Sequence, residues 1–299
     1  MNISIKQVDA FTLDPLTGNP AGVVLNAEGL TDQQMQTIAR EMAVPETAFI
    51  LSPATSAADL RIRWFTPQVE VPLCGHATIA GFHALAEDGL RGMKEPGTYR
   101  FNLETKSGIL PVSVEKSSNA VEVFFGLPVP EFIRAGQYKL DIMRILNISL
   151  EEFENRMPIV VANYLYVPIR RLHTIFALKP NFFAMSQFLS NRNLSGLCVF
   201  TTETVDKGSA VHSRFFAPTL GINEDPVTGS ANGPLGALLF ELGQVQANHD
   251  AVTLIGEQGD AIGRKGRVTI RLGVQGSLVT SVQIGGRAVT VFSGELLVG

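Results

Sequence analysis

Short runs of alternating apolar and polar residues recur along this chain, and they predict strands with one buried face. Between positions 60 and 64, for example, Leu60, Ile62 and Trp64 alternate with two arginines. Apolar runs between turn residues predict the remaining strands. These lie at 3–11, 19–25, 47–51, 98–104, 109–115, 121–125, 158–168, 197–202, 210–216, 252–256, 267–272, 278–284 and 288–292.

Four longer segments have the apolar spacing and the end signals of helices. The first begins at Thr31, which caps the helix together with Gln34, and ends near Pro45, because the residue before a proline avoids helical geometry. The others are predicted at 77–88, 181–189 and 231–242. Small residues such as Gly81 and Gly236 let two of these helices sit deep against a sheet.

One stretch of sequence occurs twice. Glu70-Val-Pro-Leu-Cys-Gly-His-Ala-Thr78 returns 154 residues later as Glu224-Asp-Pro-Val-Thr-Gly-Ser-Ala-Asn232. Upstream, Arg63-Trp-Phe-Thr-Pro67 matches Arg214-Phe-Phe-Ala-Pro218. Any two strand-turn-helix units look somewhat alike, but so many matching positions favour a duplicated fold. A strand, a glycine turn and a buried helix therefore occur in each half.

The length of 299 residues suits two domains. Gly126-Leu-Pro-Val-Pro130 has the composition of a linker. We expect an N-terminal domain at 1–125 and a C-terminal domain at 126–284. Because so many strands occur late in the chain, the last of them, about 285–299, are expected to return and complete the first domain.

The repeat places two glycine-opened helix starts in equivalent positions, which we expect to face each other across an interdomain cleft. The first turn of a helix has N–H groups without partners and a partial positive charge, so it can hold a carboxylate or an enolate oxygen. Gly75 and Gly229 allow close approach of the backbone. His76 and Ser230 then project beside the bound anion. Asp225 precedes the second turn, where the first half has an apolar valine.

Charge and composition exclude several classes of function. The net charge is -4 with no long basic run, which argues against nucleic acid or an anionic membrane as the partner. Two cysteines, Cys74 and Cys198, provide neither a disulfide framework nor a zinc set. No long apolar segment or leader pattern is evident. We expect a cytoplasmic protein that binds a small molecule.

The candidate catalytic groups each have an ordinary structural interpretation as well. A single histidine such as His76 is most often a core or capping residue. Cys74 invites a thiolate nucleophile, but its i, i+2 spacing from His76 gives little support, and a buried inert cysteine fits equally. We expect no metal, because the ligand spacing is absent. Glu46 follows a helix end at a corner; if it is partly removed from water, its pKa rises towards values useful for acid/base catalysis.

Five motifs, in this order and spacing, resemble those of the phenazine-biosynthesis PhzF-like isomerases, over nearly the whole chain. They are Gly18-Asn-Pro-Ala-Gly-Val-Val24, Pro45-Glu-Thr-Ala-Phe49, Cys74-Gly-His-Ala-Thr78, Glu224-Asp-Pro-Val-Thr-Gly-Ser-Ala231 and Gly256-Glu-Gln-Gly259. The resemblance implies an α+β fold shared with diaminopimelate epimerase. That fold has two pseudo-symmetric domains, each a curved, mostly antiparallel sheet around a central helix.

The resemblance also implies an activity: cofactor-free and metal-free proton transfer within a small carboxylate-bearing substrate, such as a cyclic dienoic acid, by a homodimeric isomerase. Glu46 matches the catalytic glutamate of the family. His76 and Asp225 match residues that assist the transfer or bind the substrate. The residues expected to bind substrate at the two turns are Cys74, Gly75, Thr228, Gly229 and Ser230.

One departure separates this chain from the two-base epimerases of the same architecture, which use a cysteine at each turn. Here Cys74 is matched by Thr228, whose hydroxyl is far too weak an acid to replace a thiol. We therefore expect no two-cysteine racemisation of amino acids. An epimerase using Cys74 as one base and a weakly active binding protein that keeps the fold are the alternatives. The resemblance leaves the substrate and any phenazine pathway open.

Overall fold

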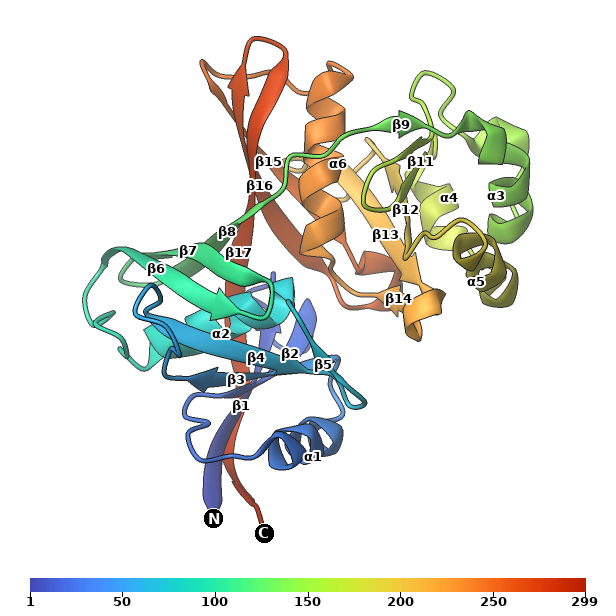
Figure 1. Cartoon of the computed structure of the whole chain (residues 1–299). Coiled ribbons are helices and arrows are strands. Elements are labelled where there is room, and N and C mark those ends of the chain that lie inside the picture. Colours follow the sequence, from blue (N-terminus) through green and yellow to red (C-terminus); the bar gives the residue numbers. More distant parts are fainter. The chain divides into compact units, whose positions relative to one another are not determined.

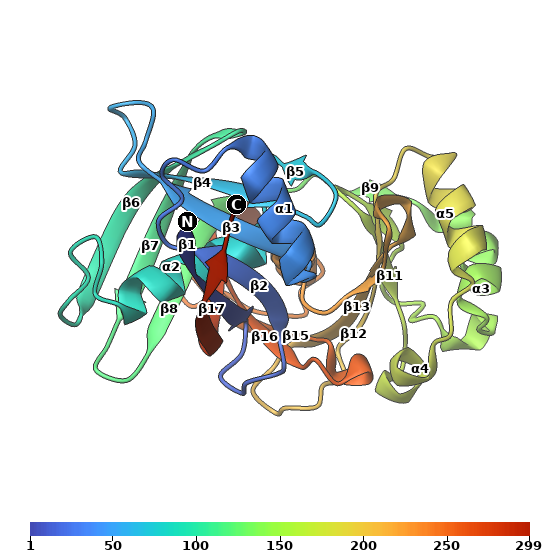
Figure 2. The same ribbon diagram turned by 90° about the horizontal axis from the view of Figure 1, so that it is seen from below.

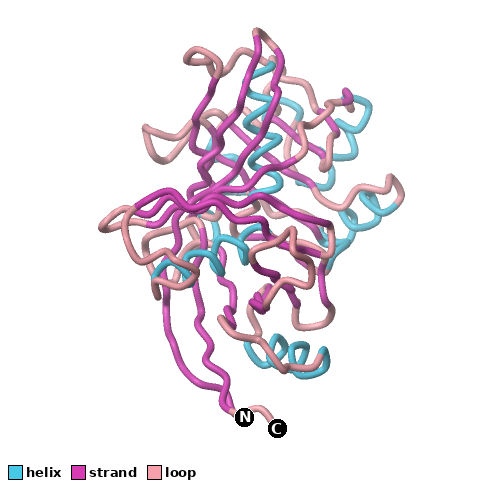
Figure 3. Tube along the Cα trace, turned by 60° about the vertical axis from the view of Figure 1, so that its left-hand side comes forward, coloured by secondary structure: helices cyan, strands magenta, loops and turns pink.

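The computed structural model describes residues 1–299 and separates into two compact units. The first unit consists of Met1–Gly126 together with Gly285–Gly299, and the second of Leu127–Ile284. Strands dominate both units, as the tube in Figure 3 shows. No helix is both long and apolar enough to span a bilayer.

The strand pairings of the first unit form a closed ring. The ring runs through β1 (Asn2–Ala10), β2 (Asn19–Val24), β3 (Glu46–Leu51), β4 (Leu60–Phe65), β6 (Gly97–Thr105), β7 (Gly108–Lys116), β8 (Val121–Leu127) and β17 (Leu278–Leu297), which pairs with both β8 and β1. Two pairings, β2 with β3 and β4 with β6, are parallel. The sheet is therefore mixed and closes like a barrel. The short strand β5 (Glu70–Val71) adds to β4.

Helix α2 (Gly75–Glu87) forms the centre of the first unit, where Figures 1 and 2 show it among the strands. It contacts β1, β2 and β3 and also β7, on another part of the ring. Ten of its 13 residues are buried, and only the last, Glu87, is exposed. Small residues make this possible: a Cβ built on Gly81 would lie 3.5 Å from Ile62 and 3.8 Å from Ile50.

Helix α1 (Asp32–Met42) covers the outside of the ring. Its N-terminus has the predicted capping box, in which Thr31 and Gln34 satisfy each other's backbone N–H groups. Its apolar residues Met35, Ile38 and Ala39 are buried in a core with residues of β1 and β3.

The second unit has the same order of pairings around its own central helix, α6 (Gly229–Glu241). Its strands are β9 (Ile133–Arg134), β10 (Val160–Val161), β11 (Leu165–Pro168), β12 (Leu197–Thr201), β13 (Val211–Ala217), β14 (Ile222–Asp225), β15 (Ala251–Gln258) and β16 (Gly266–Gln275). In the first unit, β2 is parallel to β3, β3 is antiparallel to β4, and β4 is parallel to β6. In the second unit, β11 is parallel to β12, β12 is antiparallel to β13, and β13 is parallel to β15, which is the same sequence of pairings.

Three further helices pack together in a separate apolar cluster of the second unit. They are α3 (Lys139–Leu146), α4 (Leu172–Ala177) and α5 (Phe182–Ser190). Short 3-10 turns occur at η1 (Gly136–Tyr138), η2 (Leu150–Glu152), η3 (Pro218–Leu220) and η4 (Asp260–Ile262). Asn181 caps α5 by accepting a hydrogen bond from the amide of Ala184.

Matching ion pairs support the repeated stretch in each unit. Arg63 on β4 makes a bidentate pair with Glu70, with distances of 2.8 Å for both contacts. Arg214 on β13 makes the same pair with Glu224, at 2.8 and 2.7 Å. Each pair joins the strand to the segment that leads into the central helix, so it holds the helix start in place.

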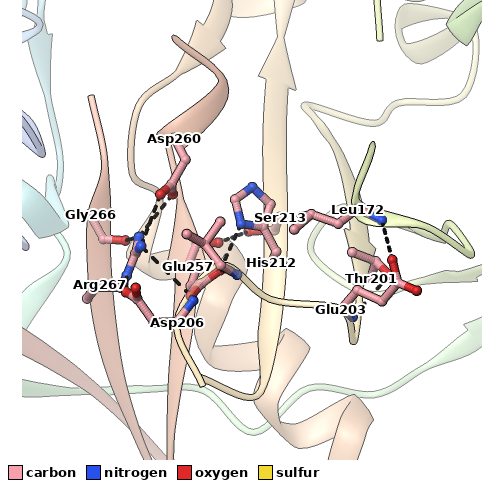
Figure 4. A network of polar contacts seen from close by, with 11 residues as sticks. Leu172, Thr201, Glu203, Asp206, His212, Ser213, Glu257, Asp260, Gly266 and Arg267 are labelled. Carbon is pink, nitrogen blue, oxygen red and sulfur yellow. Dashed lines mark hydrogen bonds and ion pairs between the residues drawn. The ribbon is translucent and has the colours of Figure 1, made fainter. Parts of the chain in front are cut away.

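A second matching arrangement lies where β13 and β15 run parallel (Figure 4). Glu257, fully buried, accepts hydrogen bonds from Nδ1 of His212 at 2.9 Å and from the amides of Val205 and Asp206. Burial alone would raise the pKa of Glu257, but these donors lower it to about 2. In the first unit, Glu104 has the corresponding role, with its carboxylate bound to two loop amides and facing Arg61.

Two sequence predictions need correction. The predicted strands at 278–284 and 288–292 are one continuous strand, β17. Gly285 is not a turn: a Cβ there would lie 2.2 Å from Phe124 and 2.4 Å from the carbonyl oxygen of Val123, so the glycine permits close strand contact. In addition, α2 and α6 begin two residues earlier than predicted, at Gly75 and Gly229.

Candidate functional site

Glu46 is placed by the end of α1 and the start of β3. Ala43 adopts the left-handed conformation that ends the helix, and Glu46 then opens β3 beside Ala21 of the parallel strand β2. Its side chain is 13% exposed. The side chain of Glu46 is therefore mostly removed from water.

His76, the second residue of α2, lies against this carboxylate. Its Nε2 is 3.2 Å from Oε2 of Glu46, which is within ion-pair distance. The ring N–H and the carboxylate are not aligned as a hydrogen bond, so Nε2 is buried without a hydrogen-bond partner.

Burial controls the charge of His76. It lowers the pKa of the imidazole from 6.5 to about 4, and the nearby carbonyl of Pro20 opposes this only in part. At neutral pH the ring is therefore uncharged. A neutral imidazole both donates and accepts hydrogen bonds, so His76 can assist a proton transfer without holding Glu46 in a permanent ion pair.

Cys74 is the N-cap residue of α2 and the third member of this cluster. Its Sγ lies 3.5 Å from Nδ1 of His76, on the ring nitrogen that does not face Glu46. The ligand atoms of Glu46, Cys74 and His76 all lie within 4.8 Å of one another. Carboxylate, thiolate and imidazole are the ligands that zinc takes, so these are the residues that could hold a metal. The expectation of no metal stays a prediction.

In the second unit, Asp225 and Thr228 form one turn before α6. The hydroxyl of Thr228 donates to Oδ2 of Asp225. Gln258 of β15 supports both residues: its amide group donates to the carbonyl of Asp225 at 2.8 Å, and its oxygen accepts from the amide of Thr228 at 3.1 Å. Asn232 also donates to Gln258 at 2.9 Å. The turn is held by a connected set of buried amides.

Ser230 is the second residue of α6, as His76 is of α2. Its hydroxyl lies 3.1 Å from the hydroxyl of Tyr164, and its carbonyl accepts from Nδ2 of Asn163 at 2.8 Å. Pro234, inside α6, explains why that carbonyl is available. Proline has no N–H, so the usual helical bond to the residue four positions earlier cannot form.

The predicted site residues thus fall into two groups. Glu46, Cys74 and His76 meet in the first unit. In the second, Asp225 and Thr228 are in contact, with Gly229 and Ser230 following at the start of α6. Gly75 opens α2 where a Cβ would lie 3.1 Å from the ring of Phe125.

The residues that support the second group were not predicted from sequence patterns. Gln258 lies in the quoted motif Gly256-Glu-Gln-Gly259, which was a usable signal. Tyr164 and Asn163 carried no signal beyond a predicted strand region, because they lie outside the repeated stretch.

Comparison with known proteins adds the family context. Residues 8–294 match the family model of the phenazine biosynthesis-like proteins (PhzC-PhzF). An uncharacterized isomerase from Clostridium acetobutylicum is 39% identical, over 98% of each chain. The crystal structure of a PhzF-family phenazine biosynthesis protein from Bacillus anthracis is 33% identical, covers all of both chains and has a TM-score of 0.88. A predicted epimerase from Pseudomonas aeruginosa, 23% identical over 99% of this chain and all of its own, shares the fold with a TM-score of 0.78.

Proposed function

The chain belongs to the phenazine biosynthesis-like family and is an isomerase, and we propose that it moves a proton within a small carboxylate-bearing substrate. Glu46 acts as the single general acid/base: it removes a proton from one carbon and returns it to another. The reaction proposed here uses only groups of the protein. A cyclic dienoic acid is the substrate class with suitable chemistry, because its conjugated carboxylate spreads the charge that develops.

The observation that supports this proposal is the contact of Glu46 with His76. A carboxylate that is 13% exposed and 3.2 Å from a neutral imidazole can gain or lose a proton without exchanging it directly with bulk water. General acid/base groups of this kind contribute roughly 10²- to 10⁴-fold to a rate. His76 is proposed to assist by hydrogen bonding to whichever form of Glu46 is present.

Substrate binding is proposed for the two helix starts and their turns. Gly75 and Gly229 supply backbone N–H groups, which attract an anion without a cationic side chain. Ser230 and Thr228 supply hydroxyls, and Asp225 is proposed to accept a hydrogen bond from a polar substituent of the substrate. The matching of α2 with α6 leads us to propose that the two units are pseudo-symmetric copies.

Incubation in heavy water tests the proposal. The enzyme is mixed with dihydro-hydroxyanthranilate and related cyclic dienoic acids, and isomerisation and deuterium uptake are followed by NMR and mass spectrometry. We expect at least one compound to react, and Glu46→Gln to slow the reaction at least 100-fold. Glu41→Gln, at an exposed position on α1, is the matched control. Full activity of Glu46→Gln, or no reaction with any of the compounds, contradicts the proposal.

A one-cysteine epimerase is the second candidate, because Sγ of Cys74 lies 3.5 Å from His76. In that case the thiol, and not Glu46, carries the proton. The two candidates differ in which variant loses activity.

A further inference from the structure

Strand registers show which residue of the second unit corresponds to Glu46. On β4, Phe65 pairs with Thr47, and on β13, Phe216 pairs with Leu197. Phe65 and Phe216 occupy the same place in the repeated sequence, directly before the Thr-Pro and Ala-Pro pairs. Thr47 therefore corresponds to Leu197, and the residue before it, Glu46, corresponds to Gly196.

Strand register also identifies the counterpart of Ala21, the residue opposite Glu46. Gly22 pairs with Thr47 across the parallel strands β2 and β3, and Leu165 pairs with Leu197 across β11 and β12. The residue before Gly22 is Ala21, which is the register partner of Glu46. Its counterpart before Leu165 is Tyr164.

At these two register positions the large and the small residue are reversed between the units. The first unit has a glutamate facing an alanine, whereas the second has a glycine facing a tyrosine. A Cβ on Gly196 would lie 2.4 Å from the ring of Phe215 and 3.2 Å from that of Tyr164. The rings of Tyr164 and Phe215, whose centroids are 4.6 Å apart, fill this space. No carboxylate can stand in the second unit where Glu46 stands in the first.

Tyr164 instead makes the contact that Glu46 makes in the first unit. Glu46 lies against His76, and the Tyr164 hydroxyl lies 3.1 Å from Oγ of Ser230, the counterpart of His76. A phenol is a stronger acid than an aliphatic alcohol, so Tyr164 is the better donor in this pair. When it donates, the hydrogen of the Ser230 hydroxyl is left to point at a ligand.

The ligand that suits a hydroxyl donor is a hydrogen-bond acceptor, such as a carboxylate oxygen. Burial and the charge of Asp225 both raise the pKa of Tyr164, and the bond with Ser230 lowers it only in part, so the pair is uncharged at neutral pH. Asn163 holds the carbonyl of the same serine at 2.8 Å. Two consecutive residues thus fix both the backbone and the hydroxyl of Ser230, which limits the directions in which it can donate.

We propose that Tyr164 is a positioning residue, which holds the Ser230 hydroxyl as a neutral hydrogen-bond donor to the carboxylate of the substrate. This inference rests on the proposed function, because it assigns the carboxylate of that substrate to the second unit.

Binding of simple carboxylates tests the inference without turnover. Dissociation constants of anthranilate, benzoate and cyclohexa-1,3-diene carboxylate are measured by NMR titration. We expect Tyr164→Phe, which keeps the ring over Gly196, and Ser230→Ala each to weaken binding roughly three- to tenfold, the effect of one hydrogen bond. The double variant is expected to bind no more weakly than either single one, because the two hydroxyls act as one unit.

Tyr138→Phe is the matched control: it removes a phenol hydroxyl from the same unit, at a ring that packs on Phe188. Melting temperatures separate loss of positioning from loss of folding. Unchanged binding in Tyr164→Phe, additive losses in the double variant, or failure of all three acids to bind the wild type overturns the inference. If the acids bind as expected but Glu46→Gln keeps full activity, the proposed function fails while the role of Tyr164 stands.

Discussion

The Glu46 carboxylate and the His76 imidazole lie 3.2 Å apart in the first unit, and the imidazole is buried and uncharged at neutral pH. The contact joins the first residue of a strand to the second residue of the central helix. Each is fixed by its own element, so the distance between them does not depend on a flexible side chain alone. This arrangement leads to measurable effects on stability as well as on catalysis.

The stability of the protein should depend on pH through His76. Because burial lowers its pKa from 6.5 to about 4, the unfolded chain takes up a proton in this window that the folded chain does not. Stability is then lost as the pH falls from 6.5 to 4, by about 3 kcal/mol for a shift of this size. Urea unfolding at several pH values measures this loss. His76→Asn should remove it, whereas His249→Gln, at an exposed position, should not. Parallel pH profiles for the wild type and His76→Asn would show that the imidazole is not held uncharged.

Replacement of Cys74 distinguishes the two candidate mechanisms. If Glu46 carries the proton, Cys74→Ala should keep turnover within about threefold, since the thiol lies against Nδ1 of His76, the ring nitrogen that does not face Glu46. Cys198→Ala, at a buried cysteine of the second unit, controls for the loss of a thiol. The rate of deuterium uptake is the measurement. A loss of more than 100-fold in Cys74→Ala alone would transfer the catalytic role to the cysteine.

The two arginine pairs should differ in strength. Arg214 also donates to the carbonyls of Ile175 and Leu178, so Arg214→Met removes one donor from each of these carbonyls and both guanidinium donors from the Glu224 carboxylate. We expect a loss of about 3–5 kcal/mol in unfolding free energy.

The equivalent Arg63→Met should cost less, about 1–2 kcal/mol, because Glu70 keeps its contact with Lys106. Adding Glu224→Leu to Arg214→Met should recover part of the loss, since no unpaired charge then stays buried. Equal effects of the two single variants would contradict this account of the repeat.

The close strand contact at Gly285 gives a paired test of the fold. Gly285→Ala places a methyl group 2.4 Å from the carbonyl oxygen of Val123, and we expect it to cost about 3 kcal/mol through backbone displacement. Gly294, on the same strand, has open space around its Cβ position. Gly294→Ala should change the stability by less than about 0.5 kcal/mol. Chemical denaturation of both variants compares them directly, and equal effects would mean that the strand can shift without cost.

Local sequence signals were sufficient for most elements. The capping box of Thr31 and Gln34 placed the start of α1, and the alternation at Leu60, Ile62 and Trp64 placed β4. These signals depend on residues close together in the sequence, so they can be recognised without knowledge of the tertiary structure. They failed at Gly285, because a glycine that permits close strand contact looks the same in sequence as one that makes a turn.

By itself, the sequence determined that one strand-turn-helix unit occurs twice, and with it the two helix starts at Gly75 and Gly229. It did not bring Glu46 to His76 or Tyr164 to Ser230. Those contacts depend on the register of parallel strands and on the packing of a central helix, which join residues that no local pattern connects. Only the tertiary structure showed that Glu46 and Gly196 occupy corresponding register positions, and that burial keeps His76 neutral.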